Sequence, residues 1–324
     1  MNAPFGIRPG DDSPLGRARL ALEGLSVGDA FGERFFVSPS VVDSLIESRA
    51  VPGAPWYWTD DTAMALSVFE HLRDHGGIDS DRLALSFANR YRRDPRRGYG
   101  GTAHGILMAI SLGAPWQEAA GSVFDGQGSM GNGAGMRSAP IGGYFAHDLA
   151  AVVAHARASA DPTHTHPDGK AGAIAVAVAA ALAWKVGLGE LDRATFLPEV
   201  AALVPAGPTR DGIEKAIALP LSYDVRTAVA ALGNGSRVIS SDTVPFSLWC
   251  AARHLDDFEA ALWTTVSGLG DRDTTCAIVG GIVALAVGHQ GIPSSFVQAR
   301  ESLDSRVDYL ERHAAEVRLG RRKP

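Results

Sequence analysis

Two acidic clusters that lie far apart in the sequence carry side chains able to bind metal ions. The first is Thr59-Asp60-Asp61-Thr62 and the second is Asp271-Arg272-Asp273-Thr274. Each opens an apolar stretch with helical spacing, so each is predicted to lie at a helix N-terminus, where unpaired N–H groups favour anions. Capping explains one carboxylate per cluster, but a second carboxylate beside the first repels it unless a cation binds.

If the two predicted helix starts face each other, they supply four carboxylates and two threonine oxygens. Such a shell suits two hard cations about 3.5–4 Å apart. No comparable set of Cys and His suggests zinc. The alternative, in which each acidic cluster only caps its helix, stays open at this point.

Two further loops contain residue types suited to ligand binding. The glycine-dense loop from Phe124 to Arg137 exposes backbone N–H groups that can hold phosphate, although a plain flexible turn has the same composition. It fits neither the dinucleotide-fold nor the P-loop pattern, and no strand precedes it. In Thr163-His164-Thr165-His166, the histidines are expected to cap a buried helix from Gly172 or to contact a polar ligand, rather than to bind metal.

The elements that must position these groups are predicted to be helices. Apolar residues recur at helical spacing in a dozen or more segments, including Leu15–Val27, Gly133–Phe145, Gly172–Val186 and Ser305–Leu319, and no alternating run predicts a sheet. Gly28-Asp29-Ala30-Phe31-Gly32 predicts either a close backbone approach or a helix ending. The sequence therefore predicts an all-α fold, a compact orthogonal multi-helix bundle.

Composition places the chain among soluble globular proteins. It has 324 residues, of which 46% are hydrophobic and 20% charged. We expect a flexible N-terminus over 1–14, one domain over 15–319 and a basic tail over 320–324. The net charge of −6 gives no basic surface for bulk nucleic-acid binding.

The two cysteines, Cys250 and Cys276, lie in apolar helical patterns and predict buried thiols in a reducing compartment, the cytoplasm. Residues 1–14 lack the apolar core of a signal peptide. The longest apolar run, Ala171 to Trp184, is shorter than the roughly 18–20 residues that cross a bilayer, so we expect a buried helix and no membrane span. The chain is expected to be a monomer.

Taken in order, five motifs resemble the ADP-ribosylglycohydrolase family, which includes dinitrogenase reductase-activating glycohydrolase and hydrolases of ADP-ribosyl-arginine and ADP-ribosyl-serine. The resemblance runs from about Leu15 to Gly288. The motifs are Gly28-Asp29-Ala30-Phe31-Gly32, Thr59-Asp60-Asp61-Thr62, Gly131-Asn132-Gly133-Ala134, Thr163-His164 and Gly270-Asp271-Arg272-Asp273-Thr274-Thr275.

This resemblance implies an all-α hydrolase with two Mg²⁺ or Mn²⁺ ions, acting on ADP-ribose joined to a protein or other acceptor. Thr59, Asp60 and Asp61 would hold one ion, and Asp271, Asp273 and Thr274 the other, with Asp273 as the bridge. Asp60 or Asp61 would handle the proton, or serve only as a metal ligand. The implied binders of the diphosphate, the ribose and the ADP portion are Phe124, Gly128, Ser129, Met130, Gly131, Asn132, Gly133 and His164.

Three positions depart from the family pattern. Serine-cleaving members carry Glu where this chain has Phe36, and Glu33, four residues after Asp29, is a candidate substitute as a catalytic residue. Arg272 stands where a small residue is common, and its cation would compete with metal unless it points away. Met130 replaces an aromatic residue of some relatives, so the identity of the acceptor is left open.

Two other functions use the same parts. A two-metal phosphoester or pyrophosphate hydrolase needs the same acidic clusters and phosphate loop. A non-catalytic ADP-ribose-binding or structural relative would also keep the fold.

Overall fold

The computed structural model describes residues 11–303, and within this range the chain forms α-helices, short 3₁₀ helices and connecting loops without a named strand. The all-α prediction is confirmed. The α-helices are α1 Pro14–Glu33, α2 Pro39–Ser48, α3 Asp60–His75, α4 Ser80–Arg93, α5 Gly101–Ser111, α6 Trp116–Gly121, α7 Ala139–Tyr144, α8 Leu149–Ala160, α9 Pro167–Gly187, α10 Phe196–Leu203, α11 Pro208–Ala218, α12 Val225–Leu232, α13 Ser240–Arg253, α14 Phe258–Val266, α15 Arg272–Val287 and α16 Ser294–Ala299.

The 3₁₀ helices are η2 Asn132–Ala134, η3 Arg193–Thr195 and η4 His289–Gly291. The helix predicted over Ser305–Leu319 and the basic tail 320–324 lie outside the described residues.

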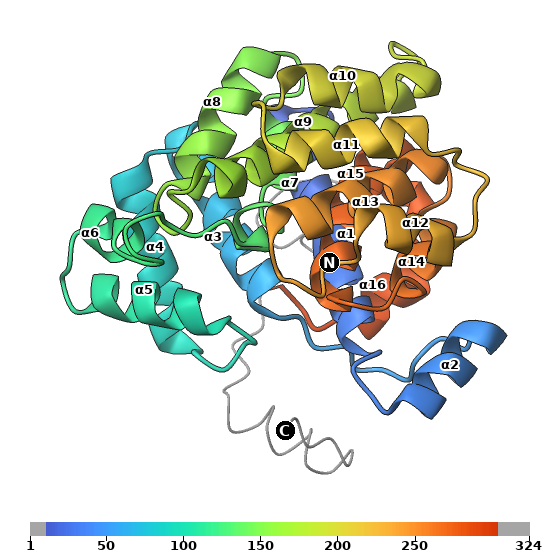
Figure 1. Ribbon diagram of the computed structural model, residues 1–324, viewed down its shortest axis with the longest axis horizontal. Coiled ribbons are helices and arrows are strands. Elements are labelled where there is room, and N and C mark those ends of the chain that lie inside the picture. Colours follow the sequence, from blue (N-terminus) through green and yellow to red (C-terminus); the bar gives the residue numbers. More distant parts are fainter. Residues whose placement is uncertain (1–10, 304–324) are drawn as a thin grey trace.

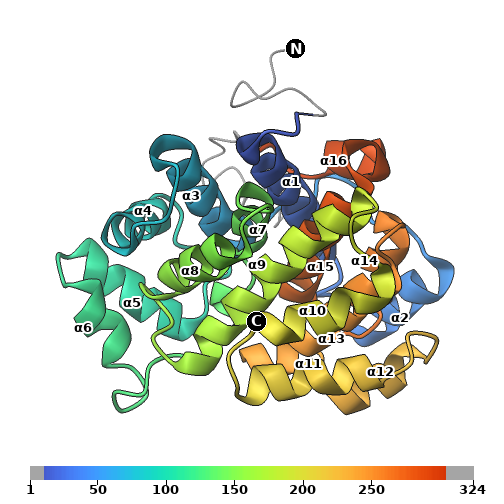
Figure 2. The same ribbon diagram turned by 90° about the horizontal axis from the view of Figure 1, so that it is seen from above.

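Helices α1 and α15 lie side by side near the middle of the molecule (Figures 1 and 2). Glycines four residues apart, Gly24, Gly28 and Gly32, put one bare face of α1 against α15. A Cβ on Gly28 would lie 2.0 Å from the Cys276 carbonyl oxygen, and a Cβ on Gly32 would lie 2.2 Å from that of Arg272. Only glycine allows the two backbones to come this close.

The structure bears on both predictions made for Gly28 to Gly32. The close backbone approach is confirmed, and α1 also ends directly after this motif, at Glu33. The extended helix carries Asp29 to the N-terminus of α3, where it becomes part of the site described below.

Helix α9 is a core helix, as predicted from its alanine-rich sequence. It begins at Pro167, five residues earlier than expected, because the His166 side chain caps it by accepting a hydrogen bond from the Asp168 N–H at 3.0 Å. With its 21 residues α9 is long and apolar enough to cross a membrane, but 83% of its apolar window is buried within the protein. The predicted helix-capping role of the histidine loop is therefore confirmed for His166.

A smaller apolar cluster joins helices α4, α5 and α6, which lie to one side of the α1–α15 pair in Figure 1. The glycine-dense loop leads from α6 back to the main body. The single helix predicted over Gly133–Phe145 is wrong: the segment forms η2, a turn and then α7. Pro140 explains the break, since it has no N–H to donate and fits only the first turn of a new helix.

Candidate functional site

The N-terminus of α3 is held by a buried carboxylate from α1. Asp29 accepts hydrogen bonds from the backbone N–H of Thr59 at 2.9 Å and from that of Thr62 at 3.0 Å. The Thr62 hydroxyl adds a bond of 2.5 Å. Burial raises the pKa of Asp29 to about 6, although these hydrogen bonds act in the opposite direction. Asp29 thus anchors the first acidic cluster.

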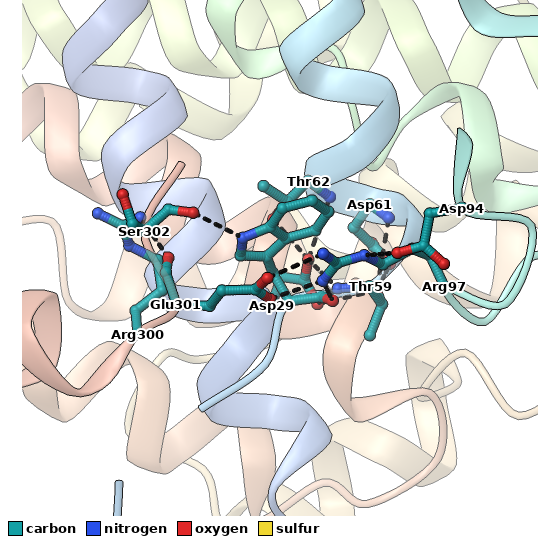
Figure 3. Close-up of polar contacts among 10 residues, drawn as sticks. Asp29, Thr59, Asp61, Thr62, Asp94, Arg97, Arg300, Glu301 and Ser302 are labelled. Atoms are coloured by element: carbon teal, nitrogen blue, oxygen red, sulfur yellow. Dashed lines mark hydrogen bonds and ion pairs between the residues drawn. The ribbon is translucent and has the colours of Figure 1, made fainter. Parts of the chain in front are cut away.

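Thr59 lies between two carboxylates, with its hydroxyl oxygen 2.8 Å from Asp29 and 2.9 Å from Asp61 (Figure 3). A threonine hydroxyl has a single proton and can donate it to only one of them. The contact with the other carboxylate needs a proton or a cation on that carboxylate. Burial, followed by the charges of Asp29, Asp60 and Asp271, raises the pKa of Asp61 well above its ordinary value.

The second acidic cluster opens α15, as the sequence predicted. Asp271 is the N-cap residue of α15, but its side chain makes no capping hydrogen bond. One of its oxygens instead accepts a 2.7 Å hydrogen bond from the amide of Asn132, in the glycine-dense loop. Capping alone therefore does not account for Asp271.

The two acidic clusters act on each other electrostatically. Burial raises the pKa of Asp273 well above its ordinary value, and the charges of Asp271, Asp61, Glu33 and Asp29 add to this in that order. One Asp61 oxygen, Oδ1, is buried and has no hydrogen-bond partner within residues 11–303. Buried carboxylates that repel each other and leave an oxygen unpaired form a donor set suited to hard cations.

The side chains do not form a closed ligand set as they stand. Across the described part of the chain, no three His, Cys, Asp or Glu side chains are arranged so that they could hold an ion. The carboxylate oxygens of Asp29 and Asp271 already accept the hydrogen bonds described above. A bound cation would therefore require side-chain rotation within the cluster.

A pocket of about 780 Å³ lies next to the acidic clusters. Asp60, Asp271, Asp273 and Thr274 line it on the acidic side. The glycine-dense loop and the histidine loop contribute Phe124, Ser129, Met130, Gly131, Asn132, Gly133 and His164. The volume falls within the roughly 300–1,000 Å³ of small-molecule sites.

The glycine-dense loop has an unusual backbone where it enters the pocket. Phe124 and Asp125 have φ values of 53° and 56°, and Gly126 and Gly128 have values of 83° and 76°. Left-handed conformations at two consecutive non-glycine residues are uncommon and concentrate at functional sites. Phe124 is 58% exposed, so this loop holds an aromatic ring in solvent at the mouth of the pocket.

The sequence was compared with those of known proteins. A family model described as ADP-ribosylglycohydrolase matches residues 11–323. The chain belongs to the ADP-ribosylglycohydrolase family. This confirms the resemblance drawn from the five motifs and the predicted enzyme class, an ADP-ribosylglycohydrolase.

Individual relatives fit this assignment. Human ADP-ribosylhydrolase ARH3 is 28% identical over 336 aligned residues, which cover 90% of each chain. ADP-ribosylarginine hydrolase Tri1 of Pseudomonas putida is 24% identical over 297, covering 89% of this chain and 75% of that protein. A solved structure titled ADP-ribosylglycohydrolase-related protein complex superposes with a TM-score of 0.65 at 22% identity, covering 90% of this chain and 94% of the other, and shows the same fold.

Four residues expected at the site of this ADP-ribosylglycohydrolase do not line the pocket: Thr59, Asp61, Glu33 and Gly128. Thr59 and Asp61 are buried next to Asp60 in the sequence. Glu33 ends α1, and its charge reaches Asp273. Gly128 has a structural reason to be glycine, because a Cβ there would lie 1.9 Å from the Thr165 hydroxyl oxygen.

Arg272, which departs from the family pattern, makes its contacts with the segment that follows α1. Its guanidinium donates a 2.5 Å hydrogen bond to the Phe35 carbonyl and lies 5.0 Å from the centre of the Phe36 ring. The side chain is thus tied to the segment after α1. The predicted competition between this cation and a metal ion stays a prediction.

A buried ion pair clasps the segment that leads into Thr59 (Figure 3). Arg97 donates to both carboxylate oxygens of Glu301, at 2.6 and 2.9 Å, and to the Trp58 carbonyl at 2.8 Å. Its guanidinium lies 3.3 Å from the centre of the Trp58 ring. This C-terminal clasp fixes the residue immediately before the first acidic cluster.

The sequence did not predict a role for one residue that lines the pocket. Arg137 lines the pocket, is fully buried, and donates to the Gly133 carbonyl, the Ser159 carbonyl and the Thr163 hydroxyl at 3.1, 2.7 and 2.8 Å. Its position in the sequence, at the end of the glycine-dense loop, was noted without a role. A charged residue among small apolar ones was the available signal.

Proposed function

We propose that this protein hydrolyses the glycosidic bond between ADP-ribose and a nitrogen or oxygen atom of an acceptor, releases ADP-ribose, and depends on two divalent cations. The observation that carries the proposal is the pocket itself. One wall holds Asp60, Asp271 and Asp273, and the adjoining wall holds the glycine-dense loop and His164.

The charges in the pocket support a requirement for cations. A diphosphate is an anion, and it would meet four pocket-lining carboxylates, those of Asp60, Asp125, Asp271 and Asp273, which repel it. The guanidiniums of Arg137 and Arg237 supply two positive charges in the pocket lining, which do not balance the four carboxylates. Two Mg²⁺ or Mn²⁺ ions, held by Thr59, Asp60, Asp61, Asp271, Asp273 and Thr274, would offset the repulsion, orient the ribose hydroxyls and activate a water molecule.

The residues of the chain have separate tasks in this proposal. The glycine-dense loop binds the diphosphate and ribose through its backbone N–H groups, and His164 binds the ADP portion. Positive charge develops on the sugar as the bond breaks, and the pocket carboxylates stabilise it. Asp60 is the leading candidate for proton transfer, since it lines the pocket whereas Asp61 is buried and does not line it.

The choice of acceptor would be made near Met130, and position 36 bears on the chemistry of that choice. Met130 lines the pocket and is 36% exposed. Phe36 is 42% exposed and has an aromatic face occupied by the Arg272 guanidinium. An apolar residue at position 36 offers no proton-transfer group there, so the proton-handling role stays with the pocket carboxylates.

Product analysis tests the proposal. Peptides carrying ADP-ribosyl-arginine or ADP-ribosyl-serine, and free ADP-ribose, are incubated with the protein in Mg²⁺, in Mn²⁺ and in EDTA. We expect intact ADP-ribose from at least one peptide, only when a divalent cation is present. Release of AMP would instead indicate a phosphoester or pyrophosphate hydrolase, and binding of ADP-ribose without any product would indicate a non-catalytic relative.

A matched pair of variants controls this assay. Asp273→Asn removes a carboxylate from the pocket and is expected to lower turnover at least about 100-fold, the scale of losing one electrostatic contact in a transition state. Asp211→Asn makes the same change at an exposed position of α11 and is expected to leave turnover unchanged.

A further inference from the structure

Arg137 is a buried cation whose hydrogen bonds all go to uncharged groups. Its guanidinium donates to the Gly133 and Ser159 carbonyls and to the Thr163 hydroxyl, and it lies 4.4 Å from the centre of the Phe87 ring. The guanidinium has only donors, so each of these contacts has a fixed direction. At the Arg137–Thr163 contact, the threonine oxygen must be the acceptor.

That direction fixes the role of the Thr163 hydroxyl toward its neighbour. Thr163 is 1% exposed, and its oxygen lies 2.7 Å from Nδ1 of His164. Having accepted from Arg137, the hydroxyl still has its own proton to donate, and Nδ1 is the acceptor within reach. If Nδ1 carried a proton instead, the Thr163 proton would be buried without an acceptor, which disfavours that arrangement roughly tenfold or more.

The consequence appears on the other side of the imidazole ring. A neutral histidine that accepts at Nδ1 carries its proton on Nε2. His164 lines the pocket, and its Nε2 lies 3.1 Å from where a Cβ on Gly131 would be. Within residues 11–303, no protein group accepts a hydrogen bond from Nε2. The absence of a side chain at position 131 leaves this nitrogen open to a ligand.

We infer that Arg137 and Thr163 are positioning residues that hold His164 in the Nε2–H form, so that the pocket presents one neutral donor which selects a ligand with an oxygen or nitrogen acceptor at that point. Within the proposed function, that acceptor belongs to the ADP portion, and this part of the inference rests on the proposed function. The assignment of the proton to Nε2 of His164 does not depend on the proposed function.

The environment keeps His164 uncharged, as this role requires. Burial, and to a smaller extent the charge of Arg137, lowers the pKa of His164 to about 3. The ring therefore donates as a neutral imidazole at physiological pH. His166, two residues on, uses its Nδ1 to cap α9 and has a different task.

The proton arrangement can be read directly by NMR. In protein labelled with ¹⁵N-histidine, long-range ¹H–¹⁵N spectra at pH 7 distinguish the two neutral forms by the shifts of Nδ1 and Nε2, and His164→Gln assigns the signals by their loss. We expect the Nε2–H form in the free wild-type protein. Observation of the Nδ1–H form, or of a charged ring, overturns the inference.

Variants at position 163 test the positioning role. Thr163→Val removes the hydroxyl at nearly constant volume, so we expect a mixture of the two neutral forms and about tenfold weaker binding of ADP-ribose by calorimetry. Thr163→Ser keeps the hydroxyl and is expected to show the Nε2–H form and the ADP-ribose affinity of the wild-type protein. Circular dichroism melting accompanies each variant, and if Thr163→Val does not fold, the wild-type spectrum and Thr163→Ser still decide the question.

The control is another buried threonine. Thr209 is fully buried and its hydroxyl oxygen has no partner within the described range, so Thr209→Val removes a hydroxyl that donates to nothing identified there. We expect the His164 spectrum and ADP-ribose affinity to stay unchanged. An unchanged His164 spectrum in Thr163→Val contradicts the inference, whereas a wild-type protein that shows the Nε2–H form but does not bind ADP-ribose contradicts the proposed function alone.

Discussion

The carboxylate of Asp29 accepts two hydrogen bonds from Thr59, the N-cap residue of α3. One comes from the threonine N–H at 2.9 Å and the other from its hydroxyl at 2.8 Å. The two residues come from different helices, so this contact sets where α3 begins relative to α1. It also holds the oxygen atoms of Thr59 and Asp61 beside the pocket carboxylates. Asp29 accordingly acts on the site by positioning the first turn of α3.

Replacing Asp29 with Asn is expected to destabilise the protein by about 1–3 kcal/mol. The asparagine amide would place its NH₂ group where one carboxylate oxygen of Asp29 accepts hydrogen bonds from Thr59 and Thr62, so two donors would face each other. Urea unfolding measures the change. Asp43→Asn on the exposed side of α2 makes the same substitution and should stay within about 0.5 kcal/mol of wild type. Equal effects of the two variants would show that Asp29 is not an anchor.

The contact between α1 and α15 makes a prediction with opposite signs at two glycines. Gly28→Ala would place a Cβ 2.0 Å from the Cys276 carbonyl oxygen, and we expect a loss of about 2–4 kcal/mol. Gly105→Ala, in α5 with nothing within 4 Å, should stabilise by roughly 0.5–1 kcal/mol. Thermal unfolding of both variants checks the prediction, and a tolerated Gly28→Ala argues against the close approach.

The fold and the acidic clusters were predictable because their signals are local. Helical spacing and the N-cap position of Thr59 can be recognised from a few consecutive residues. The proximity of Asp61 and Asp273 cannot, since it depends on how closely α1 approaches α15 through Gly24, Gly28 and Gly32. Spacing gave the possibility of that approach and could not choose between it and a helix ending.

The role of Arg137 depends entirely on distant partners. Its contacts come from Ser159 and Thr163, in other segments of the chain, and from the ring of Phe87. No sequence pattern around position 137 predicts these partners. The split of the segment 133–145 into η2 and α7 was missed for a related reason: its apolar residues keep a helical spacing, and only Pro140 marks the break.

The C-terminal clasp predicts a large loss from a small change. Glu301→Gln removes one of the two carboxylates that pair with the buried Arg97 and leaves Asp94, 2.8 Å from its Nε, as the remaining carboxylate partner within residues 11–303, so we expect about 1.5–3 kcal/mol of destabilisation in urea. Glu214→Gln breaks the exposed pair with Arg210 and should cost less than about 1 kcal/mol. A loss of similar size in both variants would contradict the clasp.

The stability of the protein is expected to depend on His164 in acid. The folded-state pKa of about 3 lies below the ordinary value of 6.5, so the folded state binds fewer protons than the unfolded state between these pH values. Stability from this group is fully present above pH 6.5 and is lost as the pH falls toward 3, by up to about 1.4 kcal/mol per pH unit.

Unfolding free energies of wild type and His164→Gln across pH 3 to 7 isolate this contribution. The variant should lose stability less steeply as the pH falls. His147→Gln, which changes an exposed histidine, should follow the wild-type curve. Parallel curves for wild type and His164→Gln would mean that folding does not lower the pKa of His164.

The most direct test of the proposed centre is a titration of Mn²⁺ into chelator-treated protein, with free Mn²⁺ followed by electron paramagnetic resonance. The proposal predicts two bound Mn²⁺ per wild-type chain and fewer in Asp61→Asn and in Asp273→Asn, while Asp211→Asn still binds two. A wild-type protein that binds no Mn²⁺, or Asp61→Asn and Asp273→Asn variants that still bind two, would contradict the claim that the two acidic helix starts form one metal centre.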